Sequence, residues 1–467
     1  MLSCGYNLAD GGGAACQRLA ARALGCRERI ELFTFLENRM SERRQSWLWR
    51  LASRCVDENV RRLFLGGSLA QVVTIAASPI LTRLYTPGDL GLLASLMSAT
   101  TILAPLVTLR FEMGLALATS REEAAAVASL AASTATLMSI GLAALALSLP
   151  VAWARHLGPL APYWWSLALS LFGNAIYAIS VYEATRIGGY EEIARSRVAQ
   201  AVITATVTIA LGVMGVHHYG VLAGFLLGVG VGPVLVIRSL LATGQSTLAG
   251  ITLGSIRSAA AKFRNFAQYS SWSEIVDLAG GQFSSIIVLT AIYGPDVGGY
   301  LFLADRVIGR PLMLVSTSIL QVYVGEIGAL FHADRAAILH RFLKASISQM
   351  VVSGGWLVTI VLLSKFIVVP LFGEKWAATV TYMQIIALGY FPATVVHSVF
   401  HTLTIIGKQR IYAIWSVIRV VVMIGVYVYC VRAGLSPIQA VALVTVTQAL
   451  GDVFRYGVTF RFVRRLQ

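Results

Sequence analysis

The chain has 467 residues, of which 57% are hydrophobic and 13% are charged. Ordinary soluble domains carry about 25% charged residues, so this composition excludes a soluble globular enzyme. The net charge of +15 would suit nucleic acid, but its distribution along the chain decides against that partner. The five cysteines lack the spacing of a zinc site, and we expect no metal, no cofactor and no disulfide framework.

Residues 1–39 contain no apolar window of membrane length and no cleavable targeting peptide. A basic, amphipathic stretch starts at Met40. We expect the natural start at Met40, with 1–39 an upstream over-read or a disordered extension and 40–61 a basic cytoplasmic lead. Intact-mass measurement on the natively expressed protein would test this, since an N-terminus at Met1 contradicts it.

Apolar windows of about 20 residues, the length that spans a bilayer, then follow one another with short joints. They predict an all-α integral membrane protein with twelve transmembrane helices and no folded extramembrane domain. The windows are 62–84, 90–110, 124–149, 163–184, 197–216, 219–239, 269–293, 298–325, 344–369, 379–403, 411–431 and 436–460.

Arginine and lysine are distributed unequally between the two sides of this map. When the spans alternate in direction, 23 of these residues fall on one side and 5 on the other. Because basic residues in short loops stay in the cytoplasm, both termini are predicted to be cytoplasmic. The positive charge is therefore explained by topology, and we expect no nucleic-acid partner.

Polar residues at helical spacing mark spans 4 and 12. In span 4, Ser166, Ser170, Asn174 and Tyr177 share one face. This stripe indicates either the lining of a cavity, with Asn174 as a substrate contact, or hydrogen bonding between helices. In span 12, Asp452 and Arg455 are expected to form a local ion pair near the inner interface.

A short repeat divides the chain into two halves. Placing residues 78–97 over 286–305 superposes Tyr85 on Tyr293, Pro87 on Pro295 and Gly91 on Gly299, and the shift equals six spans. An even number of spans keeps both copies in the same orientation, so the halves are expected to be related by a pseudo-twofold axis along the membrane normal. This predicts six-helix lobes at 62–240 and 269–460, a cytoplasmic linker at 241–268 and a basic tail at 461–467.

Span 8 carries Asp305, Arg306 and Arg310, followed by Pro311. A charge in the hydrocarbon region costs about 2.5 to 3.5 kcal/mol on insertion scales, so such charges normally face a bundle interior or a water-filled path. Arg306 and Arg310 project from one helical face because they are four residues apart. The proline favours a kink at this point.

Spans 1, 2, 7 and 8 are expected to line a cleft between the lobes. Glu274 and Asp277 in span 7 would then face it, with Arg83 at its outer mouth and Arg110 at its inner rim. Arginines suit an anionic substrate such as a phosphate, and buried carboxylates exchange protons readily. Arg419 in span 11 is a further candidate substrate contact.

Several segments, in matching order from about Val60 to the C-terminus, resemble the oligosaccharide flippases of the O-antigen (Wzx) type. They include TRLYTPGDLG, GYLFLADRVIGRPL, QVYVGE, FGEKW and IIGKQ. These flippases belong to the multidrug, oligosaccharidyl-lipid and polysaccharide exporter (MOP) superfamily. The N-terminal extension departs from the family pattern.

The resemblance implies a bacterial inner-membrane flippase that moves an undecaprenyl-diphosphate-linked oligosaccharide from the cytoplasmic to the periplasmic leaflet by alternating access. Membrane lipids, a polysaccharide polymerase and a chain-length regulator are the implied partners, and O-antigen, capsule or exopolysaccharide the product. We expect Arg306, Arg310, Arg419, Arg83 and Asn174 to bind substrate. Asp277, Glu274 and Asp305 are the expected coupling residues. A multidrug antiporter or a peptidoglycan-precursor flippase of the same superfamily is the alternative, whereas the short loops argue against a membrane-embedded transferase.

Overall fold

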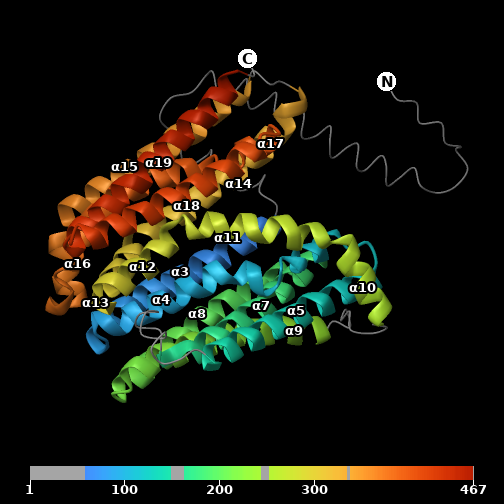
Figure 1. Cartoon of the computed structure of the whole chain (residues 1–467), viewed down its shortest axis with the longest axis horizontal. Helices are drawn as coiled ribbons and strands as arrows, with labels where there is room; N and C mark the ends of the chain where they lie inside the picture. Colours follow the sequence, from blue (N-terminus) through green and yellow to red (C-terminus); the bar gives the residue numbers. More distant parts are fainter. Residues whose placement is uncertain (1–57, 149–161, 243–251, 334–336, 466–467) are drawn as a thin grey trace, which may run out of the picture. The chain divides into compact units, whose positions relative to one another are not determined.

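The computed structural model describes residues 58–148, 162–242, 252–333 and 337–465. The proposed start at Met40, the segment 1–39 and most of the lead 40–61 lie outside these ranges. Within them every regular element is a helix and no strand occurs. Figure 1 shows the long helices side by side, coloured from blue at the first to red at the last.

Eleven described helices are long and apolar enough to cross a membrane, and a bent pair makes the twelfth span. The sequence-based expectation of twelve spans is confirmed in number. The first six are α3 (Glu58–Leu84), α4 (Pro87–Val107), α5 (Arg121–Ser148), α7 (Trp164–Arg186), α8 (Tyr190–Val213) and α9 (His217–Ala242). The second six are α11 (Ser271–Ala279) with α12 (Gln282–Tyr293), α13 (Pro295–Ala304) with η4 (Asp305–Gly309) and α14 (Arg310–Ala333), α15 (Ala337–Phe372), α16 (Thr379–Ser398), α18 (Gln409–Arg432) and α19 (Pro437–Arg464).

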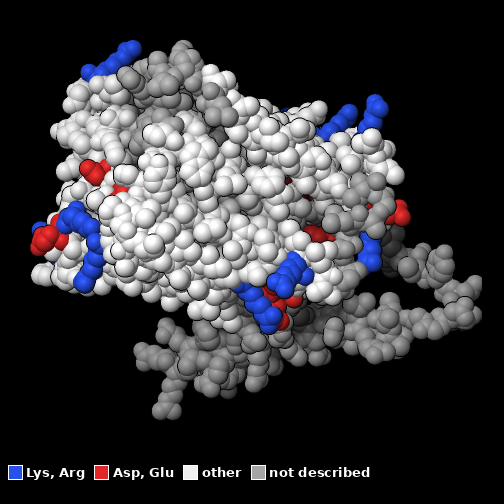
Figure 2. Space-filling view, turned by 90° about the horizontal axis from the view of Figure 1, so that it is seen from below, with Lys and Arg blue, Asp and Glu red and all other residues white. Residues whose placement is uncertain are grey.

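Five short elements connect the spans, namely η1 (Phe111–Leu117), α10 (Leu253–Lys262), η3 (Phe266–Ser270), η5 (Glu374–Trp376) and α17 (Thr402–Ile405). The outward faces of the spans are apolar, with Leu137, Phe366 and Val421 each more than 60% exposed. Figure 2 shows a broad white area without charged residues, with most of the blue and red groups gathered in a few places near its edges. Such a surface suits lipid rather than water.

The spans pack as two lobes. In the first, α4 packs against α5, α7 and α9, and α8 against α9; in the second, α16 packs against α14, α15 and α19. The lobes meet where α4 packs against α11, α12 and α13, as Figure 1 shows at the blue and yellow helices. Spans 2, 7 and 8 are therefore neighbours, whereas the cleft that they were expected to line together with span 1 stays a prediction.

The repeated residues form the contact between the lobes. A Cβ on Gly91 would lie 1.8 Å from the carbonyl oxygen of Pro295, and a Cβ on Gly299 would lie 1.9 Å from that of Pro87. Each glycine thus lets the backbone of the other lobe approach, in two equivalent contacts. The N-terminus of α4 is fixed locally by Thr86, whose hydroxyl accepts the Asp89 N–H in a capping box. We call this the hairpin end of the bundle, and the opposite end, beyond α4, the Arg110 end.

Span 7 is broken, whereas the sequence predicted one continuous helix over 269–293. α11 ends at Ala279 and α12 starts at Gln282, with a bend of 51° between them. Gly280 and Gly281 form the break, and the Gly281 carbonyl accepts the hydroxyl of Ser284 at 2.8 Å and the amide of Gln448 at 3.4 Å. A broken span is tolerated in lipid because side chains satisfy the freed backbone groups.

The predicted linker 241–268 contains a helix of its own. α10 starts after the N-cap Thr252 and buries Ala259, and Phe263 follows directly as its C-cap. Both side chains pack in a cluster with Phe111, Leu115 and Val127 of the first lobe. The helix was missed because ten residues with a single apolar face resemble an irregular joint. The lobe boundaries proposed from the sequence stay a prediction, although α19 continues as a helix to Arg464.

Candidate functional site

The charged turn of span 8 has a wider helical geometry than its neighbours. η4 is a π-helix in which the N–H of Arg310 bonds to the carbonyl of Asp305, five residues earlier. Pro311 follows immediately and has no N–H to donate. The distortion expected from the proline is thus present, in the turn just before it. Single π-turns inside α-helices are frequent at functional sites.

Asp305 and Arg310 form an ion pair, with Arg310 Nε 3.0 Å from Asp305 Oδ2. The hydroxyl of Tyr390, on α16, donates to the other carboxylate oxygen. Gly309 makes room for this arrangement, since a Cβ there would lie 2.2 Å from the Tyr390 hydroxyl and 2.5 Å from Asp305 Oδ1. Arg310 is thereby fixed in one position by a neutralising partner.

Arg306 differs from Arg310 because no described residue forms an ion pair with it. Its guanidinium lies over the ring of Phe302, 5.2 Å from the centroid, and the residue is partly exposed. Arg306 follows Pro295, the first residue of its span, by eleven positions, which is about 16 Å along a helix axis. The charge therefore lies about a third of the way along the 33-residue span Pro295–Ile327, inside an apolar segment where an uncompensated charge is costly.

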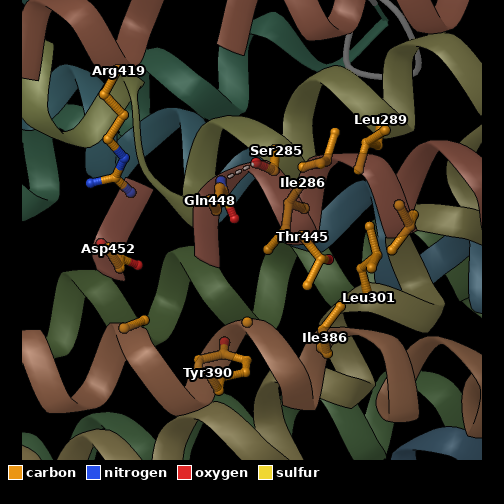
Figure 3. Close-up of a pocket in the computed structure, with 14 residues that line it drawn as sticks. Ser285, Ile286, Leu289, Leu301, Ile386, Tyr390, Arg419, Thr445, Gln448 and Asp452 are labelled. Carbon is orange, nitrogen blue, oxygen red and sulfur yellow. Dashed lines mark hydrogen bonds between the residues drawn. The ribbon is translucent and has the colours of Figure 1, made fainter. Parts of the chain in front are cut away.

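A polar pocket of about 90 Å³ lies inside the second lobe, between α12, α13, α16, α18 and α19 (Figure 3). Its polar lining comes from Ser285, Tyr390, Arg419, Thr445, Gln448 and Asp452. Gln448 donates to the Ser285 hydroxyl at 2.8 Å, and the Arg419 side chain extends toward Asp452. Gly280 and Gly281 pass close to Arg419, with a Cβ on Gly280 only 3.2 Å from its Cγ. The break in span 7 therefore gives this arginine its space.

Tyr390 belongs to both features, because its side chain lines the pocket and its hydroxyl donates to Asp305. Tyr390 thus lies next to both the Asp305–Arg310 ion pair and the pocket that Arg419 lines.

Asp452 also lines the pocket and forms no ion pair with Arg455 among the described residues. The predicted pair between these two residues is wrong, since Arg455 stacks on Phe400 and Tyr412 instead.

The predicted coupling residues of span 7 have separate partners. Asp277 accepts the hydroxyl of Ser416 at 3.3 Å. Glu274 lies 4.0 Å from Arg110 of the first lobe, so this pair spans the two lobes at the Arg110 end. Leu109 and Arg110 have φ values of 50° and 59°, a left-handed conformation that is strained for residues with a Cβ.

Glu112 lies two residues beyond Arg110, in η1, and its side chain is buried. Burial raises the pKa of its carboxyl, although Thr108, its own backbone N–H and Arg110 oppose the shift. One carboxylate oxygen, Oε2, has no hydrogen-bond partner within the part of the chain that the structure describes. The neutral acid is therefore the form that this environment favours.

Arg83 and Asn174 lie apart from the charged turn. The Arg83 side chain is exposed at the hairpin end, and its carbonyl accepts from Lys375 at 3.1 Å. The Asn174 amide donates to the carbonyl of Ser170, whose hydroxyl in turn bonds to Thr100 at 2.8 Å. Of the two interpretations of the span 4 stripe, hydrogen bonding accounts for Ser170, as it does for Tyr177, which bonds to Ser196 at 3.1 Å.

Two features escaped the sequence analysis. Tyr390 gave no signal, because one tyrosine in an apolar span is ordinary. Trp376 and Lys375 belong to FGEKW, a segment used only for the resemblance; Trp376 is fully buried and its indole N–H donates to the Thr82 carbonyl at 2.8 Å. The segment thus joins the second lobe to the end of α3.

Residues 80–381, more than half of the chain, match the family model described as polysaccharide biosynthesis protein. The chain belongs to this family. No curated protein matches the chain.

This chain shares its fold with several solved transporter structures. One is the lipid II flippase MurJ in an inward closed conformation, with a TM-score of 0.68, 12% identity and 86% of this chain and 89% of that chain covered. A second is a multidrug resistance MATE transporter of the MOP superfamily in an inward-facing conformation. Its TM-score is 0.56 and its identity is 13%, with 86% of this chain and 94% of that chain covered. A third is a MOP superfamily transporter from Pyrococcus furiosus, described as having a binding pocket of reverse polarity. Its TM-score is 0.53 and its identity is 15%, with 87% of this chain and 95% of that chain covered. The resemblance found in the sequence is confirmed for the polysaccharide biosynthesis family, and these structures show the same fold.

Proposed function

We propose that the protein is a flippase of the O-antigen (Wzx) type, which moves undecaprenyl-diphosphate-linked oligosaccharide from the cytoplasmic to the periplasmic leaflet. It would do so by alternating access between the two lobes, for the assembly of O-antigen, capsule or exopolysaccharide. The observation that carries the proposal is the guanidinium of Arg306, which forms no ion pair with a described residue and lies about a third of the way along its span, in a chain of the polysaccharide biosynthesis family.

Arg306 and Arg310 have different roles in this proposal. Arg306 is free of any ion pair with a described residue, so it can take a diphosphate oxygen without losing a partner. Arg310 is held by Asp305, and a diphosphate would have to compete with that carboxylate. Guanidinium donors suit phosphate because they are always charged and fixed in plane. Arg419, Arg83 and Asn174 would contact the substrate beyond this centre.

Coupling to an ion gradient needs a group whose charge changes during the cycle. Asp277, Glu274 and Asp305 are the proposed coupling residues. Asp305 is neutralised by Arg310, and Glu274 faces Arg110, whereas Asp277 has a hydroxyl as its partner. Of the three, Asp277 alone has no cationic partner among the described residues, which makes it the preferred coupling residue.

The proposed orientation places the Arg110 end in the cytoplasm of a bacterial inner membrane, with both termini on that side. It rests on the excess of arginine and lysine in the loops of that end. In this orientation the hairpin end, where Gly91 and Gly299 meet, is periplasmic.

A deletion strain tests the function directly. We expect lipid-diphosphate-linked oligosaccharide to accumulate on the cytoplasmic leaflet, and we expect rescue by the wild type but not by Arg306→Ala. Arg432→Ala removes an exposed arginine from the far end of α18 and serves as the matched control, with full rescue expected. All variants are compared at equal membrane abundance.

Each other outcome identifies a specific failure. Absence of accumulation in the deletion strain excludes the flippase and favours a multidrug antiporter. If the deletion is lethal and only a known peptidoglycan-precursor flippase rescues growth, the substrate of this protein is the peptidoglycan precursor. Full rescue by Arg306→Ala leaves a flippase but removes Arg306 from its site.

A further inference from the structure

A second, apolar pocket lies on the lipid-facing side of the second lobe, away from the polar pocket described above. It has a volume of about 250 Å³ and lies between α17, α18 and α19. Its apolar lining includes Ile414, Trp415, Ile418 and Phe454. Ile414 and Phe454 are about 60% exposed, so the pocket opens to the surface that faces lipid.

One charge lines this apolar pocket. Arg455 is 7% exposed, and its guanidinium carbon lies 4.6 Å from the ring centroids of both Phe400 and Tyr412. None of the described residues forms an ion pair with it, and no side-chain acceptor bonds to it. A guanidinium held between two rings keeps its charge, and its N–H groups are not used by an ion pair with a described side chain.

The surroundings of Arg455 carry charges of both signs. Asp452, on the same helix, and Asp277, beside Tyr412, are the nearby carboxylates. Burial and the charge of Arg455 lower the pKa of His401, so this histidine adds little positive charge. Arg461 and Arg464 follow on the same helix, in its last turns. Arg455 precedes Arg461 by six residues, about 9 Å along the axis, so it lies less than two turns inside the basic end of α19.

We propose that this pocket binds an anionic phospholipid of the surrounding leaflet, with its phosphate on Arg455 and one acyl chain along Ile414, Ile418 and Phe454. The charge of the site selects an anionic headgroup. The lining provides Arg455 as its one charged group, whereas the hydroxyl of Tyr412 lies against Asp277 and the other side chains are apolar. One cation suits one phosphodiester, and such a lining has no set of donors for a glycan. A lipid-linked oligosaccharide is therefore the less suitable occupant.

Native mass spectrometry of the full chain, released from membranes that contain equal amounts of phosphatidylglycerol and phosphatidylcholine, tests the proposal. We expect the wild type to retain phosphatidylglycerol preferentially, and Arg455→Met to lower its retention about tenfold, the loss of one charge-assisted contact. Arg461→Met removes an exposed arginine from the same helix and is the matched control, with retention within about twofold of the wild type.

Ile418→Trp provides a second variant that leaves the buried charge in place. Ile418 lines the pocket and is 47% exposed, so the larger side chain fills the groove without disturbing the interior. We expect it to lower phosphatidylglycerol retention while the unfolding temperature stays at the wild-type value.

Three results would overturn the proposal. These are equal retention of the two phospholipids by the wild type, unchanged retention in both Arg455→Met and Ile418→Trp, and displacement of phosphatidylglycerol by an equimolar undecaprenyl-diphosphate lipid. The last would assign the groove to the substrate. Loss of transport in Arg306→Ala with normal phospholipid retention would separate this site from the proposed substrate site.

Discussion

Gly91 of the first lobe and Gly299 of the second occupy equivalent positions in the repeat and pack directly on each other. A Cβ on Gly91 would lie 2.8 Å from the backbone nitrogen of Gly299. The contact is reciprocal, because each glycine also lies against the proline that starts the partner helix, Pro295 or Pro87. Two related surfaces that meet in this way place the pseudo-twofold axis between α4 and α13.

Replacing either glycine by alanine is expected to force the lobes apart at the hairpin end. Gly91→Ala and Gly299→Ala should lower the unfolding temperature by similar amounts, since the clashing partner in each case is backbone that cannot rotate away. Gly425→Ala is the control, because nothing lies within 4 Å of a Cβ at that position. Thermal unfolding in detergent measures all three, and a lower temperature in only one glycine variant would contradict the symmetry of the contact.

A disulfide across the lobes should hold the hairpin end closed. A Cβ on Gly88 would lie 3.1 Å from Asp296 Oδ1, which places residues 88 and 296 within reach of a cysteine pair. We expect Gly88→Cys with Asp296→Cys to form the bond, to stop transport when oxidised and to recover it on reduction. Gel mobility reports bond formation. Transport that continues in the fully cross-linked protein would show that the hairpin end does not have to open.

Trp376 should contribute strongly to stability because it is fully buried between the lobes and donates to Thr82. Trp376→Ala is expected to cost about 3–5 kcal/mol, the usual loss for a large buried aromatic side chain. Trp376→Phe keeps most of the volume and leaves the Thr82 carbonyl without its partner, so it should cost about 1 kcal/mol. Denaturant unfolding of the purified variants measures both. Equal stability of the two variants would show that packing contributes little.

Gly309 offers a way to disturb the charged turn without removing any charge. Gly309→Ala would place a Cβ 2.2 Å from the Tyr390 hydroxyl, so the contact from Tyr390 to Asp305 should break and transport should fall at least tenfold. Gly325→Ala, on the same helix and in open space, should transport normally. The two variants are compared in the oligosaccharide accumulation assay at equal abundance. Normal transport by Gly309→Ala would show that the Tyr390 contact is dispensable.

Glu112 should make stability depend on pH. Its pKa is raised in the folded protein by burial, so its neutral form is favoured; the contribution to stability is present at acidic pH and is lost as the pH rises through that raised value. Glu112→Gln cannot ionise and should unfold at a higher temperature than the wild type at pH 8. The difference should shrink as the pH is lowered toward 4. Unfolding curves at several pH values measure this, and a constant difference would assign the effect to packing.

Much of the architecture could be predicted because apolar stretches of bilayer length, and the proline and glycine residues between them, are local signals in the sequence. Twelve windows of bilayer length gave the spans, and Tyr85, Pro87 and Gly91 revealed the repeat because the same three residue types recur at the same spacing as Tyr293, Pro295 and Gly299. The charged turn of span 8 was also visible, since Asp305, Arg306 and Arg310 stand out in an apolar segment.

Other features depend on contacts between distant segments and could not be read in the same way. The break at Gly280 and Gly281 needs the side chain of Gln448, from the last span, to satisfy its carbonyl. The place of Tyr390 depends on which helix packs against η4. Arg455 was assigned to Asp452 from its spacing on one helix, but the two rings that hold it come from other elements.

The contact between Gly91 and Gly299 also has a mechanical consequence. Because it joins backbone to backbone near one tip of α4, it can act as a fulcrum, and the part of α4 from Gly91 to Val107 is then a lever of about 24 Å. A rotation of roughly 20° about that fulcrum would carry the far tip through about 8 Å. A wide opening between the lobes at the Arg110 end would thus need almost no displacement at the two glycines. The stiffness of α4 would then set how far the lobes separate.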